Sequence, residues 1–257
     1  MTPSELFSIK DKVAVVLGGT SGIGQAIARG FAEAGAITIA SSRDQAKVDA
    51  MAAEFEKLGA KTLRLTSDVQ DRASLERLCN EVVLAFGQVD ILVVTSGTLK
   101  KAPTAELSEE DWTRVIDVNL TGSFRANQIF GRQMIRQQSG CIINTCSLTS
   151  FVSLLEVAPY AASKAGVLLL TESLANEWAR YNIRVNAIAP GFFRTPLNAH
   201  VLDLPERKAA ISGRTPMGRV GKVEELVGAA IFLASPASSF VTGETIVVDG
   251  GFLSRGI

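Results

Sequence analysis

Histidine, tyrosine and cysteine are scarce in this chain of 257 residues. It has one histidine, His200, two tyrosines and three cysteines. A Ser–His–Asp hydrolase or a histidine-rich metal site would depend on His200 alone, and no nucleophile-elbow motif lies near it, so neither is favoured. Cys79, Cys141 and Cys146 are odd in number and lack metal-ligand spacing, which makes small buried hydrophobes their expected role. We predict no metal site.

The chain also lacks net charge and long apolar runs. Its 26 basic and 26 acidic side chains balance, whereas surfaces that bind nucleic acids or anionic membranes have a basic excess. No run reaches the ~18 apolar residues needed to span a bilayer, and the charged N-terminus MTPSELFSIKDK has no signal-peptide core. We therefore expect a cytoplasmic protein that binds a small molecule, with neither nucleic acid nor membrane as a partner.

Short apolar runs alternate with longer segments of helical periodicity along the chain. The runs are continuously apolar, which is typical of strands buried on both faces, and repeated strand–helix–strand units indicate a parallel, doubly wound sheet. The predicted strands are Val13–Leu17, Ile37–Ala40, Thr62–Leu65, Ile91–Val94, Cys141–Thr145, Arg184–Ile188 and Thr245–Val248. The predicted helices include Ile23–Glu33, Asp44–Leu58, Ser74–Phe86 and Tyr160–Arg180. We predict one α/β Rossmann domain over residues 1–257, with about seven strands, helices on both faces and an irregular substrate lid around 191–220.

A glycine-rich segment joins the first predicted strand to the first helix. It reads LGGTSGIG over Leu17–Gly24. Glycines allow a tight turn and a close approach of the backbone to a pyrophosphate, which then lies at the N-terminus of the helix. A strand before and a helix after distinguish such a loop from an ordinary turn. The predicted dinucleotide-binding residues here are Gly18, Thr20, Ser21, Gly22, Ile23 and Gly24.

The end of the second strand indicates which dinucleotide is bound. It reads Ala40-Ser41-Ser42-Arg43, with no acidic residue until Asp44. A carboxylate at the strand end would bind ribose hydroxyls and repel a 2′-phosphate, whereas an arginine and a serine hydroxyl suit that phosphate. Arg43 could instead be solvated, with Asp44 as a helix N-cap. We favour NADP bound through Ser42 and Arg43, and NAD is the alternative.

Further motifs follow the glycine-rich loop in a specific order. They are Asp68-Val69, Asn119 within DVNLTGSF, Ser147, Tyr160-Ala-Ala-Ser-Lys164, Pro190-Gly191 with Thr195, and the ending VTGETIVVDGG. With this order and spacing the chain resembles the short-chain dehydrogenase/reductase family over essentially its whole length. The resemblance implies hydride transfer between a nicotinamide cofactor and a carbonyl or secondary alcohol, with Asp68 at the adenine. It also implies cofactor contacts from Val69, Ser96, Gly97, Tyr160, Lys164, Pro190, Gly191 and Thr195.

The spacing of Tyr160 and Lys164 places both side chains on one face of a helix. The pKa of a free tyrosine is about 10, so a neighbouring ammonium that lowers it would make proton exchange with an alcohol feasible. Ser147 would hydrogen-bond the substrate oxygen, where charge develops. The resemblance makes Tyr160 the general acid/base, places Lys164 also at the nicotinamide ribose, and assigns a proton-relay water to Asn119. These four residues are the predicted catalytic centre.

Two segments depart from the family pattern. Leu17 replaces a threonine, and Val94-Thr95-Ser96-Gly97 replaces Asn-Asn-Ala-Gly. In the family these polar residues tie two strands together. We expect an apolar contact of Leu17 with Val94 in place of the polar tie, with consequences for cofactor affinity rather than for the catalytic centre.

The residues expected around the substrate are mixed in character. Leu148–Val157 and Phe192 are suited to an acyl chain or an apolar ketone, whereas Lys100, Lys101 and Arg194 are suited to a carboxylate or phosphate. The predicted substrate-binding residues are Ser147, Leu148, Leu154, Tyr160, Phe192 and Lys100. The pair Lys100-Lys101, the stretch APYAASK and the segment RTPMGRVGKVEELVGAA resemble the gluconate 5-dehydrogenase-like branch, which acts on sugar acids. The 3-oxoacyl carrier-protein reductase branch is the other near resemblance. Both stay open, as does a non-catalytic nucleotide-binding homologue.

The predicted quaternary structure follows from the resemblance alone. Relatives are usually tetramers with contacts through the C-terminal segment. The tail of this chain contains Phe252 and Leu253, which a monomer would expose unless the tail folds back onto its own subunit. We predict a homotetramer.

Overall fold

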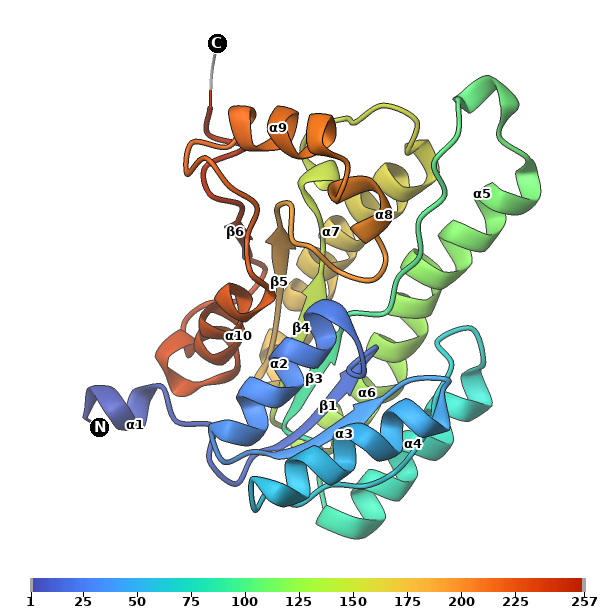
Figure 1. Ribbon diagram of the computed structural model, residues 1–257. Coiled ribbons are helices and arrows are strands. Elements are labelled where there is room, and N and C mark those ends of the chain that lie inside the picture. Colours follow the sequence, from blue (N-terminus) through green and yellow to red (C-terminus); the bar gives the residue numbers. More distant parts are fainter. Residues whose placement is uncertain (1, 256–257) are drawn as a thin grey trace.

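Six parallel strands form one sheet in the computed structural model, which describes residues 2–255 (Figure 1). Their order is β2-β1-β3-β4-β5-β6, so the direction of winding reverses between β1 and β3. Sheets of this kind bind ligands beyond the carboxyl ends of the strands, beside such a reversal. The strands are β1 (Val13–Leu17), β2 (Ile37–Ser41), β3 (Ile91–Val94), β4 (Gly140–Thr145), β5 (Ile183–Pro190) and β6 (Thr245–Val248).

Helices connect the strands and cover both faces of the sheet (Figure 1). The α-helices are α1 (Pro3–Leu6), α2 (Gly22–Glu33), α3 (Gln45–Lys57), α4 (Arg72–Phe86), α5 (Glu109–Ile116), α6 (Gly122–Gln137), α7 (Ala158–Trp178), α8 (Ala199–Leu202), α9 (Pro205–Arg214) and α10 (Val227–Ala234). Short 3₁₀ turns are η1 (Thr104–Glu106), η3 (Leu148–Ser150), η4 (Ala179–Tyr181), η5 (Val223–Leu226) and η6 (Pro236–Ser238), and η2 (Asp117–Thr121) is a π-helical turn. Within the described residues, no helix combines the length and the apolarity required to cross a bilayer.

The predicted helices are found with ends shifted by no more than two residues, and local sequence explains where they begin and end. Asp44 and Asp71 accept hydrogen bonds from backbone amides in the first turns of α3 and α4. Gly87 ends α4 with a φ of 82°, a conformation that glycine adopts without steric cost. These caps fix the helix ends from which the loops at the edge of the sheet depart.

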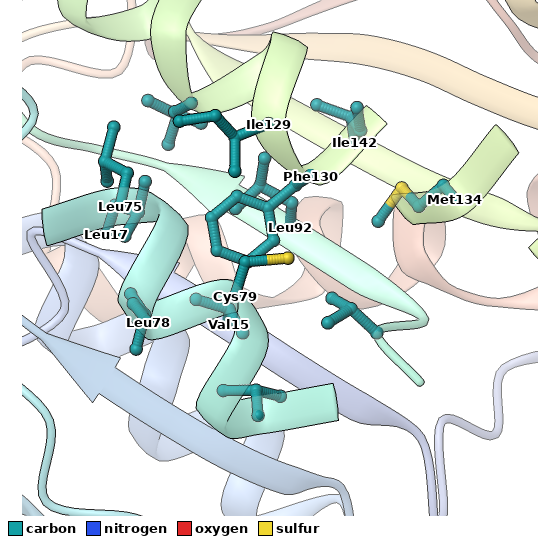
Figure 2. Packing of buried hydrophobic residues seen from close by; sticks show 14 of the residues in the cluster. Val15, Leu17, Leu75, Leu78, Cys79, Leu92, Ile129, Phe130, Met134 and Ile142 are labelled. Carbon is teal, nitrogen blue, oxygen red and sulfur yellow. The ribbon is translucent and has the colours of Figure 1, made fainter. Parts of the chain in front are cut away.

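The two faces of the sheet carry separate hydrophobic cores because side chains alternate along each strand. On β1, Val13, Val15 and Leu17 belong to the core covered by α4, α6 and α7, while Ala14 and Val16 face the core under α2, α3 and α10. Figure 2 shows the first core, in which Phe130 lies among side chains from the sheet and from α4. Burial on both faces explains the continuously apolar strands.

The expectation of about seven strands was wrong, because Thr62–Leu65 forms no strand. The segment runs beside β2, but the contacts are sparse and partly made by side chains. The amide of Thr38 donates to the carbonyl of Lys61, and the hydroxyl of Thr62 donates to the carbonyl of Thr38. Without a regular ladder of backbone hydrogen bonds, an apolar run of strand-forming residues stays an extended edge segment.

The stretch 191–220 is less irregular than expected, and its role as a substrate lid stays a prediction. Residues in this stretch form α8 and α9, which lie beyond the carboxyl ends of the strands in Figure 1. The loops on either side of the two helices are irregular, as the prolines and glycines of the segment suggested. The predicted domain of residues 1–257 also includes Met1, Gly256 and Ile257, which lie outside the described residues.

Candidate functional site

A cavity of about 480 Å³ opens at the carboxyl ends of the central strands. It lies where the winding reverses, between the loop after β1 and the loops after β2 and β3. Twelve of the predicted cofactor-binding residues line it: Gly18, Ser21, Gly22, Ile23, Gly24, Ser42, Arg43, Asp68, Val69, Ser96, Gly97 and Thr195. Loops from distant parts of the sequence therefore converge on one elongated site.

The glycine-rich loop has positions at which a side chain would be strained or would clash with its neighbours. Gly18 has a φ of +76°, a left-handed conformation that L side chains rarely adopt. A Cβ on Gly24 would lie 2.3 Å from both the Gly18 carbonyl oxygen and Thr95 Oγ1. The loop thus brings the N-terminus of α2 against the cavity, where backbone amides and the helix dipole favour a phosphate group.

The prediction that an apolar contact replaces the polar tie between β1 and β3 is only partly correct. Leu17 and Val94 pair in register and belong to the same apolar core, as predicted. A polar tie is nevertheless present one residue later, because the hydroxyl and the amide of Thr95 both donate to the Leu17 carbonyl, at 2.7 and 2.9 Å. The side chain of residue 17 is irrelevant to this tie, since its backbone oxygen is the acceptor.

Polar groups at the end of β2 are arranged to receive an anion. Thr20 Oγ1 donates to Ser42 Oγ at 2.8 Å, which leaves the hydrogen of the Ser42 hydroxyl available to a ligand. Arg43 lines the cavity, and no carboxylate within residues 2–255 pairs with it. Asp44 is occupied elsewhere, because its carboxylate caps α3 and pairs with Lys47. Thr20 itself is buried and does not line the cavity.

The predicted catalytic residues lie together beside the ends of β3 and β4. Ser147 follows β4, and Tyr160 and Lys164 occupy successive turns of α7. Lys164 Nζ donates to the Thr145 carbonyl oxygen at 2.6 Å and lies 5.8 Å from the centre of the Tyr160 ring. Ser147 Oγ accepts a hydrogen bond from the Thr149 amide at 3.2 Å. The serine hydrogen is therefore free for another acceptor, either Tyr160 or a substrate oxygen.

The pKa of Tyr160 is shifted in the direction opposite to the one expected. Burial raises it, and the hydrogen bond with Ser147 opposes that rise only in part. The Lys164 ammonium does not lower it, because Nζ is held at the Thr145 carbonyl rather than at the phenol oxygen. Burial also lowers the pKa of Lys164 to about 8. The bare protein therefore favours the neutral phenol, which is the proton-donating form.

Asn119 is fully buried and ties the loop after β3 to α7. Its Oδ1 accepts from the Thr98 amide at 2.8 Å, and its Nδ2 donates to the Thr98 carbonyl and to Ser163 Oγ, each at 3.0 Å. A Cβ on Gly97 would lie 3.5 Å from Asn119 Oδ1 and 3.9 Å from Lys164 Nζ. The cavity therefore ends beside the predicted catalytic residues Asn119 and Lys164, since Gly97 belongs to its lining.

Replacing Lys164 with methionine is expected to make stability less dependent on pH. The folded protein holds the pKa of Lys164 at about 8, below its ordinary value of 10.5. Between these pH values the unfolded chain binds more protons than the folded one, so wild-type stability rises with pH through this window. Across this window the free energy of unfolding of the wild type should rise by up to about 3 kcal/mol more than that of Lys164→Met. Urea unfolding of both proteins at pH 7 and pH 10.5 measures this rise. If the wild type and the variant differed in stability by the same amount at both pH values, the prediction would be contradicted.

The predicted substrate-binding residues are more dispersed. Leu148 is buried, and Phe192 packs edge-on against Phe252 and lines a separate cavity of about 70 Å³. Leu154 is half-buried and does not line the larger cavity. Phe252 is itself buried, so the tail folds back onto its own subunit, and the argument from the tail for a tetramer is lost. The homotetramer stays a prediction.

The three cations expected to attract an anionic substrate each already pair with a carboxylate. Lys100 Nζ lies 2.9 Å from Asp111, and Lys101 Nζ lies 3.0 Å from Glu156. The guanidinium of Arg194 forms two hydrogen bonds of 2.7 Å with a third carboxylate, that of Asp203. A substrate carboxylate would have to exchange with these acidic side chains.

Several cavity-lining residues have only indirect signals in the sequence. Ser67, Gln70, Thr95 and Thr98 adjoin predicted cofactor-binding residues, and Pro196 and Leu197 follow Thr195, so wider motif boundaries would have included them. Val118 precedes Asn119 within DVNLTGSF, whereas Arg114 lies outside every motif and only the fold brings it to the cavity. Pro190 and Gly191 end β5 and do not line the cavity, because Gly191 packs against Asp249.

Comparisons with known proteins find a matching family model and similar dehydrogenases and reductases. A family model described as enoyl-(acyl carrier protein) reductase matches residues 18–253. A 2-dehydro-3-deoxy-D-gluconate 5-dehydrogenase of Pseudoalteromonas atlantica is 42% identical over 252 residues, which cover 98% of this chain and 99% of that protein. A 3-oxoacyl-[acyl-carrier-protein] reductase of Thermotoga maritima is 40% identical over 247 residues, covering 95% and 99%. The crystal structure of a gluconate 5-dehydrogenase from Burkholderia cenocepacia J2315, in complex with NADP and tartrate, superposes with a TM-score of 0.95 at 40% identity, covering 98% of this chain and 99% of that one.

Proposed function

Because the chain belongs to the short-chain dehydrogenase/reductase family, as a gluconate 5-dehydrogenase-like oxidoreductase, we propose that it interconverts a ketone and a secondary alcohol on a sugar acid. NADP(H) is the cofactor, and Tyr160 is the general acid/base. The observation that carries the proposal is the grouping of Ser147, Tyr160 and Lys164 beside the Gly97 end of the cavity.

The polar groups of the cavity fit a dinucleotide with a 2′-phosphate. The loop after β2 and Asp68-Val69 would hold the adenosine half, with Ser42 and Arg43 binding the phosphate. Support comes from the free hydrogen of Ser42 and from the absence of a paired carboxylate at Arg43 within the described residues. The N-terminus of α2 would hold the pyrophosphate. The B. cenocepacia relative was solved with NADP, which agrees with this assignment.

Proton transfer in the proposed reaction is the task of the chain's own residues. A bound nicotinamide would supply the hydride for reduction and accept it in the reverse direction. On reduction, the Tyr160 hydroxyl donates its proton to the substrate oxygen as the C–H bond forms, and on oxidation the phenolate takes that proton back. Ser147 donates a hydrogen bond to the same oxygen, where negative charge develops. Lys164 Nζ, which is held at the Thr145 carbonyl oxygen in the bare protein, would bind the nicotinamide ribose.

The substrate class rests on the named activities of relatives, several of which are gluconate or deoxygluconate 5-dehydrogenases. A 3-oxoacyl thioester is the second candidate, because the T. maritima relative, which has that activity in its name, is 40% identical. The mostly apolar segment Leu148–Val157 adds support to this second candidate. The two substrate classes differ chemically, because a sugar acid carries a carboxylate of its own and a 3-oxoacyl thioester does not.

A substrate panel tests the proposal. We expect oxidation of NADPH with keto-sugar acids, and slower or no oxidation with 3-oxoacyl thioesters and simple ketones. NADH is run in parallel with each substrate. Turnover of the thioesters alone would replace the substrate class, and binding of NADPH without turnover of any substrate would favour a non-catalytic binder.

A further inference from the structure

A π-helical turn carries Asn119 and connects α5 to α6. It spans Asp117–Thr121, and the Gly122 amide donates to the Asp117 carbonyl oxygen. Turns of this kind are rare, which indicates that the α-helical arrangement is intrinsically favoured, and they are frequently found at functional sites. Contacts with the rest of the protein must therefore hold it. At its centre Asn119 makes the three hydrogen bonds that fix the loop at Thr98 and the helix at Ser163.

The first residue of this turn is bonded to a distant loop. Gln70 Nε2 donates to Asp117 Oδ2 at 2.9 Å, and the Arg125 guanidinium lies 2.9 Å from Asp117 Oδ1. Arg125 also donates to the Val69 carbonyl oxygen at 3.3 Å. The Arg125 and Asp117 side chains are only 22% and 28% exposed, so their pair is better shielded from water than the other ion pairs of the described surface.

The loop at the other end of this bridge belongs to the cofactor cavity. Asp68, Val69 and Gln70 all line it. Packing supports the polar link, because a Cβ on Gly122 would lie 2.9 Å from Val69 Cγ2. The loop and the π-helical turn are thus joined in two ways. The Asp117 carboxylate binds both Gln70 and Arg125, and Gly122 packs so closely against Val69 that a side chain at residue 122 would not fit. A displacement of one requires a displacement of the other.

We propose that the Asp117 carboxylate couples occupancy of the adenosine end of the cavity to the order of the π-helical turn that positions Asn119. The inference rests on the proposed function in one respect, the location of the adenosine half at Asp68–Gln70. Asp117 is a positioning residue in this scheme, since it reaches the catalytic centre only through the backbone of the turn. A ligand that orders Gln70 stabilises the turn, because Asp117 keeps both partners only when the loop is in place.

Amide hydrogen exchange with cofactor fragments tests the coupling without any turnover. Adenosine 2′,5′-bisphosphate and AMP carry the adenosine half and no nicotinamide. We expect one of them to slow exchange in residues 117–122 by at least about 5-fold, the lower range of allosteric couplings. In Asp117→Asn, which keeps the shape but loses the charge, the slowing should disappear. Arg125→Met removes the same bridge from α6, and Glu110→Gln, an exposed carboxylate on α5, is the matched control.

Each outcome separates the coupling from the choice of cofactor. Slowing by AMP alone would contradict the NADP assignment and leave the coupling in place. Equal slowing in the wild type and both bridge variants would overturn the coupling, because it would show protection by direct contact, for example at Val118. No slowing by either fragment would overturn it as well. Thermal unfolding of each variant distinguishes loss of the bridge from loss of the fold.

Discussion

Replacing Tyr160 with phenylalanine is expected to lower kcat/KM by about 10²–10⁴, the usual contribution of a positioned general acid/base. The ring and its packing on α7 stay, and only the exchangeable proton is lost. Burial raises the pKa of this hydroxyl, so in the wild type the proton is present at neutral pH and available to a ketone. Steady-state oxidation of NADPH with the best substrate of the panel measures the loss.

The second tyrosine provides a matched control for this variant. Tyr181 packs against Arg180 at the end of α7, remote in sequence from the motif, and Tyr181→Phe should leave kcat/KM unchanged. Binding of NADPH to Tyr160→Phe, followed by fluorescence, should change far less than turnover does. Near-normal turnover of Tyr160→Phe would refute the acid/base role even if the substrate class proved correct.

Replacing Arg43 with alanine is expected to weaken NADPH binding by about 10- to 100-fold, because a hydrogen bond between charged groups contributes about 1.5–3 kcal/mol. NADH lacks the 2′-phosphate, so its binding should hardly change. Arg43 lines the cavity and has no carboxylate partner within residues 2–255, which leaves its whole charge for the ligand. Titration of both cofactors into the variant measures the ratio of their dissociation constants.

A neighbouring cation tests whether tighter binding of NADPH depends on the position of Arg43 or only on positive charge in this region. Lys47 lies on α3, pairs with Asp44 and does not line the cavity. Lys47→Gln removes the same charge from the same region and should leave the ratio unchanged. The preference of the wild type for NADPH should also weaken as salt is added, because the contact is exposed. An NADPH preference that survives Arg43→Ala would contradict the assignment of the phosphate.

Local patterns in the sequence were sufficient wherever the physical cause is itself local. The glycines at 18 and 24, the helix caps and the apolar strands each follow from backbone sterics or from side-chain periodicity over a few residues. The segment Thr62–Leu65 shows the limit of such patterns. Its residues favour a strand, yet a strand needs a neighbour with a complete hydrogen-bond ladder, and β2 offers only scattered contacts.

The candidate site shows the same division. The sequence determined the family, the dinucleotide loop, and the residue types of the proposed catalytic centre, because these depend on spacing along one helix or one loop. Only the tertiary structure decided the charge environment. It paired Lys100, Lys101 and Arg194 with acids, held Lys164 at a backbone carbonyl, and set the direction of the Tyr160 pKa.

The link from Asp117 to Gln70 and Arg125 also exists only in three dimensions. Its three residues come from three separate segments, and only Asp117 belongs to a motif, DVNLTGSF. Electrostatic interactions and desolvation depend on every group within several ångströms, whatever its position in the chain. The sequence by itself therefore determined which chemical groups this protein has and in what order, and tertiary packing decided which of them are free to meet a ligand.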